Sequence, residues 1–167
     1  QDEGRPLTTS GFHYVAFAPP AGNDGAETAA LHVADGSQVV AGHAHHRALT
    51  VFAGDERFGS CVGRVRPGSL AAGWLPILRT RYVDADGNRY AQESFAWHLP
   101  GRSAVASFVR LTVDARRAVV LRMKVDDGAA RSRAVRAGES GALYVAWQHT
   151  PMLRTVSSSA YAAARRA

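Results

Sequence analysis

The sequence predicts an all-β fold, an antiparallel β-sandwich with a short helix that begins at its C-terminal end. Three observations predict it. Short runs of alternating apolar and polar residues recur along the chain. Turn-forming residues separate these runs at intervals of about 8–12 residues, which is typical of a sandwich or barrel. Only the segment after residue 156 has the composition of a helix.

The first part of the chain contains four short strand candidates after a loose arm at residues 1–10. Aromatic and β-branched residues predict the first strand, which ends at Pro19 and Pro20 because proline donates no hydrogen bond to a ladder. Asp35-Gly36 predicts a hairpin turn. Residues 58–76 are rich in glycine and are expected to be irregular. The four predicted strands cover residues 12–17, 29–33, 37–41 and 48–53.

The clearest pattern is a β-meander from Ile77 to Val113, whose first two strands flank the turn at residues 84–88. Its register has two solutions. A two-residue turn places Thr80 opposite Glu93 and keeps the apolar face of the hairpin together. A three-residue loop instead places Arg79 opposite Glu93 as an ion pair. We favour the two-residue turn, because it preserves the apolar face.

Alternation continues after the meander at residues 119–125 and 143–148, whereas residues 129–141 are polar. Ser157 is a good helix N-cap, and the alanines and arginines that follow it are good helix formers. We therefore expect a sandwich domain over residues 1–156 and the start of a linker helix at 157–167, cut off at a fragment boundary.

The composition restricts the classes of partner. The net charge of +6 comes from 19 Arg and one Lys against 14 acidic residues. The arginines are scattered along strands and turns, so we expect no nucleic-acid partner. No run approaches the roughly 18 apolar residues of a membrane helix, so we expect no membrane partner. The single cysteine, Cys61, excludes an intrachain disulfide and is expected to be a small buried hydrophobe.

Two segments carry a family resemblance, LPILRTRYVDADGNRYAQESFA at residues 75–96 and SFVRLTV at residues 107–113. They resemble the N-terminal β-sandwich domain of glycoside hydrolases built on an (α/α)6 barrel, and the resemblance covers residues 74–167. It implies a supersandwich-like fold in an accessory domain that packs on a catalytic barrel and helps shape the substrate cleft. The catalytic carboxylates of that family lie on the barrel, so no catalytic residue is assigned to this chain. The expected location is secreted or extracytoplasmic, and otherwise cytoplasmic.

Aromatic side chains provide a second hypothesis, an independent carbohydrate-binding module. Trp74, Tyr82 and Tyr90 could stack on sugar rings, because exposed aromatic residues present flat apolar faces with polar edges. Trp74 follows Gly73 in a loop, so we expect it to be the most exposed of the set. The alternative, which we favour for the set as a whole, is packing in the core.

A histidine cluster, His43, His45 and His46, provides a third hypothesis, a small metal-dependent enzyme. Imidazole is a common ligand of zinc, copper and nickel. A closed site needs further ligands, for which His13, His32 and Asp55 are candidates. The alternative, which we favour, is a solvated loop beside a strand, and we expect no cofactor.

Glu93 and the acidic turn at residues 84–88 are the remaining candidates. A carboxylate on an apolar face must be paired, hydrogen-bonded or protonated. We expect Glu93 to pair with an arginine, because the sequence offers no second carboxylate for a glycosidase pair. The turn has oxygen ligands at alternate positions like a calcium loop, but Phe95 occupies the position of the required glutamate. A hairpin turn explains it fully.

Overall fold

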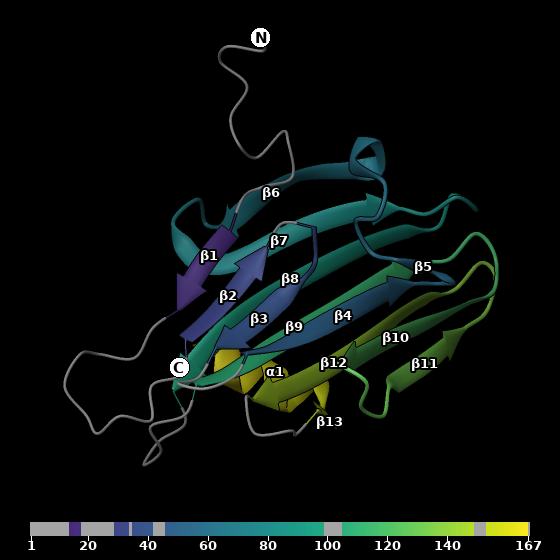
Figure 1. The fold of residues 1–167 in the computed structure, drawn as a ribbon. Helices are drawn as coiled ribbons and strands as arrows, with labels where there is room; N and C mark the ends of the chain where they lie inside the picture. Colours follow the sequence, from purple (N-terminus) through teal and green to yellow (C-terminus); the bar gives the residue numbers. More distant parts are fainter. Residues whose placement is uncertain are drawn as a thin grey trace, which may run out of the picture.

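The computed structural model describes residues 14–17, 29–33, 35–41, 46–98, 105–148 and 153–166. In this part of the chain, two antiparallel sheets, called sheet A and sheet B, pack face to face, and one helix lies on the outer side of sheet B (Figure 1). The predicted all-β sandwich with a C-terminal helix is therefore confirmed.

Sheet A has the strand order β1-β2-β3-β4-β10-β11, and β5 pairs with β4. Its strands are β1 (Tyr14–Phe17), β2 (Ala29–Val33), β3 (Gln38–Ala41), β4 (His46–Ala53), β5 (Glu56–Arg57), β10 (Val119–Val125) and β11 (Arg131–Val135). Sheet B has the order β13-β12-β9-β8-β7-β6. Its strands are β6 (Val65–Ala71), β7 (Leu75–Val83), β8 (Arg89–His98), β9 (Val105–Asp114), β12 (Ser140–Gln148) and β13 (Arg154–Thr155). A 3-10 turn, η2 (Val62–Arg64), precedes β6.

The main core lies between the two sheets and contains alternate residues of each strand, as the period of two in a β-strand requires. Among the described residues, two pairs of polar side chains cross it. Trp147 Nε1 on β12 donates to Gln38 Oε1 on β3 at 3.0 Å. His32 Nε2 on β2 and Ser107 Oγ on β9 form a hydrogen bond of 3.0 Å. These bonds supply polar partners inside the core and tie one sheet to the other.

The register of the β7–β8 hairpin differs from the one favoured on sequence grounds. Arg79 lies opposite Glu93, so the three-residue loop is correct and the two-residue turn is wrong. The physical reason lies in the turn. Asp84 Oδ1 accepts a hydrogen bond from the Asn88 main-chain N–H at 2.8 Å, and Asp84 Oδ2 accepts one from Asn88 Nδ2 at 2.7 Å. Gly87 has a φ of 79°, which favours glycine.

This register still separates apolar from charged side chains. Tyr82 lies opposite Tyr90 on the inner face of sheet B, where both are buried. Arg79 and Glu93 lie on the outer face, together with Phe95 two residues further along β8. The outer face therefore has its own apolar residues and its own charges.

Two strands lie in segments that show no clear alternation in the sequence: β6 where irregular chain was expected, and β11 within the polar segment 129–141. β6 forms an edge of sheet B, and its pairing with β7 shifts between Arg66 and Ser69 and again between Leu70 and Ala71. Pro67 lies within the first shift and donates no ladder hydrogen bond. β11 forms an edge of sheet A, and only one of its five residues is buried. Edge strands with irregular pairing or little burial lack the alternation that identifies a strand in sequence.

The helix α1 (Ser158–Arg166) covers part of the outer face of sheet B (Figure 1). Ser157 Oγ accepts a hydrogen bond from the Ala160 N–H at 3.1 Å, which confirms the predicted N-cap. Tyr161 is buried, with its ring 5.4 Å from those of Phe95 and Tyr144. A second, smaller apolar cluster therefore lies beneath the helix. In the described part of the chain, no helix combines the length and apolarity needed to cross a membrane.

The buried His32 predicts a specific dependence of stability on pH. Burial lowers the pKa of His32 to about 3 from its ordinary value of 6.5, although a backbone hydrogen bond to Ser94 acts in the opposite direction. As pH falls below the ordinary value, the unfolded chain binds a proton that the folded chain does not. The free energy of unfolding should therefore fall by up to about 1.4 kcal/mol per pH unit until the folded pKa is reached.

We expect His32→Gln to remove this part of the slope, measured by urea unfolding between about pH 6.5 and about pH 5. His46→Gln, at an exposed position, is the matched control and should retain the wild-type slope. Equal slopes for wild type and His32→Gln would contradict the prediction.

Candidate functional site

Three surface features of the described residues are candidates for function. They are a pocket at one end of the sandwich, a cluster of arginines around Glu93 on the outer face of sheet B, and a pair of exposed tryptophans.

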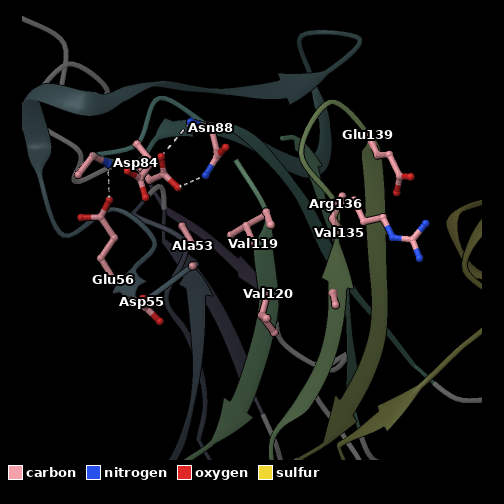
Figure 2. A pocket seen from close by; sticks show the side chains of 15 residues that line it. Ala53, Asp55, Glu56, Asp84, Asn88, Val119, Val120, Val135, Arg136 and Glu139 are labelled. Atoms are coloured by element: carbon pink, nitrogen blue, oxygen red, sulfur yellow. Dashed lines mark hydrogen bonds between the residues drawn. The ribbon is translucent and has the colours of Figure 1, made fainter. Parts of the chain in front are cut away.

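The end pocket has a volume of about 810 Å3 and is lined by the β7–β8 turn and by residues at the ends of β4, β10 and β11. Figure 2 shows Glu56 and Asp84 on one side and Arg136 and Glu139 on the other, with apolar side chains such as Val119 between them. The pocket therefore combines an apolar floor with charged walls.

Two carboxylates on the first side of this pocket already have partners. Glu56 accepts hydrogen bonds from Arg64 at 2.9 and 2.8 Å, and from the Ala85 N–H at 3.0 Å. Asp84 accepts bonds from Asn88 and, at 2.8 Å, from the Tyr90 hydroxyl. These acids hold the β7–β8 turn in place, as expected for a structural hairpin. Among the described residues, no group of three or more His, Cys, Asp or Glu could hold a metal ion.

Glu93 is the centre of the charged cluster on the outer face of sheet B. Its side chain is 3% exposed. It pairs with Arg79 Nε on β7 at 2.8 Å, with Arg165 Nε on α1 at 3.1 Å and with Arg110 on β9 at 3.5 Å. Tyr161 on α1 donates its hydroxyl to the Glu93 main-chain oxygen at 3.2 Å and to Oε1 at 3.3 Å. The expected structural pairing with arginine is therefore confirmed.

Opposing effects set the pKa of Glu93. Burial raises it, but the hydrogen bond from Arg79 and the positive charges of Arg110 and Arg165 together outweigh burial, so the pKa lies below its ordinary value. Burial and the neighbouring Glu93 charge raise the pKa of Tyr161. Glu93 therefore acts as a fixed anion that holds three cations from three elements.

The arginines around Glu93 line a hollow of about 320 Å3 on the outer face of sheet B. Its cationic lining consists of Arg66, Arg79, Arg81 and Arg110, and Glu93 is its one acid. The sequence predicted scattered arginines. Strand pairing brings them together, because Arg79 and Arg81 share a face of β7 and lie beside β6 and β8. The sequence offered one sign of this cluster: Arg79 and Arg81 are two residues apart in a predicted strand, so their side chains share a face of it.

Two large aromatic side chains are exposed at one end of sheet B. Trp74 is 73% exposed and Trp97 is 48% exposed. Trp74 immediately precedes β7, and Trp97 is near the end of the neighbouring antiparallel strand β8, so both belong to the same end of the sheet. The expected exposure of Trp74 is confirmed.

Tyr82 and Tyr90 do not join Trp74 in a stacking platform. They are 0% and 2% exposed, because the register of the hairpin places both on the inner face of sheet B. The Tyr82 ring packs 5.2 Å from that of Phe58. Burial, followed by the hydrogen bond and charge of Asp84, raises the pKa of Tyr90. Both tyrosines are core residues, which corrects their assignment as sugar-stacking residues.

The residues of the histidine hypothesis are only partly described. His13, His43 and His45 lie outside the described residues, and His46 is exposed at the start of β4. His32 is buried in the core against Ser107, and Asp55 follows the opposite end of β4. The structure therefore does not bring His32 and Asp55 to His46 as further ligands.

Cys61 is half-buried and packs against the main core, close to the expected small hydrophobe. A hydrogen bond with Arg64 lowers the pKa of its thiol, although partial desolvation acts in the opposite direction.

Comparisons of the chain with protein-family models, with curated proteins and with solved structures find no match.

The Glu93 cluster predicts a stability loss that depends on pH. Glu93→Gln removes the charge that the three arginines share, and we expect the free energy of unfolding to fall by about 2 kcal/mol at neutral pH. Because the folded pKa of Glu93 lies below its ordinary value of 4.5, this contribution is present above that value and is lost as pH falls through the folded pKa.

Urea unfolding of wild type and Glu93→Gln at neutral and at acid pH tests this expectation. The two proteins should differ at neutral pH and converge at acid pH. Glu139→Gln, which changes an exposed acid at the end pocket, is the matched control. A constant difference between wild type and Glu93→Gln at all pH values would refute the electrostatic explanation.

Proposed function

We propose that this chain is a non-catalytic accessory β-sandwich domain of a carbohydrate-active enzyme of the glycoside hydrolase class. It packs on a catalytic (α/α)6 barrel and helps shape the substrate cleft. The resemblance of residues 74–167 to the N-terminal sandwich of such enzymes suggests the class.

The observation that carries the proposal is the attachment of α1 to the outer face of sheet B. Tyr161 is buried beneath the helix and bonds to Glu93, and Arg165 pairs with the same carboxylate. In the enzymes that the sequence resembles, a linker helix joins the sandwich to the barrel. A helix held by both apolar packing and an ion pair would fix the direction in which the chain leaves the sandwich, and so would orient one domain against the other.

A second candidate function is independent carbohydrate binding, and the exposure of Trp74 favours it. A tryptophan that is 73% exposed presents a large apolar face to solvent, where a sugar ring can stack. Trp97 extends this aromatic surface at the same end of sheet B. The two functions are compatible, since an accessory domain can also contact the polysaccharide.

The accessory role predicts that the natural reading frame continues past Ala167 into helical hairpins of a catalytic barrel. Sequencing the gene downstream of this codon tests it directly. The longer protein, expressed intact, should hydrolyse glycosidic bonds, and limited proteolysis should release the sandwich slowly because α1 is held on it. A frame that ends at Ala167, with no barrel chain encoded beside it, would overturn the accessory role.

The carbohydrate-binding role predicts that Trp74→Ala weakens binding to polysaccharide by about tenfold, since the loss of one large stacking face costs about 1.4 kcal/mol or more. Affinity electrophoresis of the chain in gels that contain soluble polysaccharides measures this. Val62→Ala, at another exposed apolar position, is the control and should bind like wild type. Unchanged retention of Trp74→Ala would exclude Trp74 as a binding residue.

A further inference from the structure

The hollow around Arg66, Arg79, Arg81 and Arg110 has more positive charge than the fold uses. Glu93 neutralises one positive charge, and it does so by pairing with Arg79, Arg110 and Arg165. Within the described part of the chain, neither Arg66 nor Arg81 has an ion-pair partner. Among the described residues, two cations of the hollow therefore remain for an anionic ligand to pair with.

These two arginines also lie in an arrangement that does not favour stability. Arg66 on β6 and Arg81 on β7 are direct cross-strand partners. Like charges at directly opposed positions of a sheet repel each other. An anion bound between the two guanidinium groups would relieve this repulsion, so the arrangement is better suited to binding than to holding the sheet together.

Short side chains leave room beside the arginines. Arg81 faces Ala91 on β8, and Ser69 lies near the other side of the hollow on β6. A second hollow of about 700 Å3 shares Arg81 and Ala91 with the first and is also lined by Arg89 and Arg133. The cationic surface is therefore extended along the outer face of sheet B, and it offers places for more than one anionic group.

The guanidinium group matches a specific ligand chemistry. Its planar fork donates two parallel hydrogen bonds to a carboxylate, sulfate or phosphate, with more geometric selectivity than a lysine ammonium has. The four arginines of the first hollow come from β6, β7 and β9 of one sheet, so a rigid scaffold holds them.

We propose that this surface binds an acidic polysaccharide through the carboxylate or sulfate groups of successive sugar units. The inference rests on the proposed carbohydrate-related function and names the charge class of its substrate. The arginine row is interrupted by acids, Glu93 in the first hollow and Asp114 in the second. A nucleic-acid backbone, with closely spaced phosphates, favours an uninterrupted positive track. An acidic polysaccharide has carboxylates or sulfates separated by whole sugar rings, which fits the interrupted pattern better.

The experiment measures the affinity of the purified chain for polygalacturonate, dextran sulfate, uncharged dextran and a single-stranded oligonucleotide, by titration at low and at physiological salt. The test variant is Arg66→Ala/Arg81→Ala, since both positions are exposed and neither residue holds Glu93. Arg136→Ala/Arg117→Ala is the matched control, because it removes the same charge from exposed positions outside both hollows. Ala91→Leu fills the hollow without a change in charge. Thermal unfolding confirms that each variant folds.

The expected result is binding to at least one acidic polysaccharide, with little binding to uncharged dextran. The test variant should bind about tenfold or more weakly, since each charge-assisted hydrogen bond contributes about a factor of ten. Ala91→Leu should also weaken binding, the control should not, and added salt should weaken wild-type binding.

Three outcomes would overturn the inference. Equal losses in the test and control variants would show attraction to net charge alone. Tighter binding to the oligonucleotide than to either acidic polysaccharide would assign the surface to nucleic acid. The chain could bind uncharged dextran in a way that depends on Trp74 but not on Arg66 and Arg81. That result would refute an acidic ligand but would agree with the proposed carbohydrate-related function. A missing barrel, by contrast, would remove the accessory role and leave this surface unaffected.

Discussion

The ion pairs of Glu93 are the interaction on which the outer half of this structure depends. One nearly buried carboxylate lies within 2.8 to 3.5 Å of three arginine side chains from β7, β9 and α1. A carboxylate buried without partners would be costly, so the sheet and the helix must supply them together. The Arg79–Glu93 pair fits the observed hairpin register, and Arg165 with Tyr161 attaches the helix. A single charge thus connects strand pairing to helix docking.

The inner and outer faces of sheet B use different chemistry for different purposes. The inner face packs against sheet A through apolar side chains and through polar contacts that include Trp147 with Gln38 and His32 with Ser107. The outer face has a small apolar cluster under α1, exposed Trp97 and the arginine hollow. Stability therefore resides mainly between the sheets, and the outer face of sheet B is the one that we propose contacts a ligand.

The acidic residues of the end pocket illustrate why a pocket is not in itself a binding site. Glu56 and Asp84 line the larger pocket, yet Arg64, Asn88 and Tyr90 already occupy their acceptor atoms. In the arginine hollow the situation is reversed, because the cations outnumber the one acid and Arg66 faces Arg81. The end pocket and the arginine hollow therefore differ in how far the fold itself supplies partners for the charges that line them. This difference favours the arginine hollow, on the outer face of sheet B, as the place where a ligand binds.

The sequence by itself determined the fold class, most strands, the Asp35-Gly36 turn and the Ser157 cap, because alternation and turn chemistry act over a few residues. It also indicated that Glu93 pairs with arginine and that Trp74 is exposed. Only the tertiary structure decided the β7–β8 register, because the apolar pattern and the Arg79–Glu93 pair favoured different registers. The hydrogen bonds between Asp84 and Asn88 accompany the observed register, in which Arg79 lies opposite Glu93. It likewise decided the edge strands β6 and β11, the burial of Tyr82 and Tyr90, and the gathering of four arginines from three strands. These features depend on which strands become neighbours, and that information lies in contacts between residues far apart in the chain.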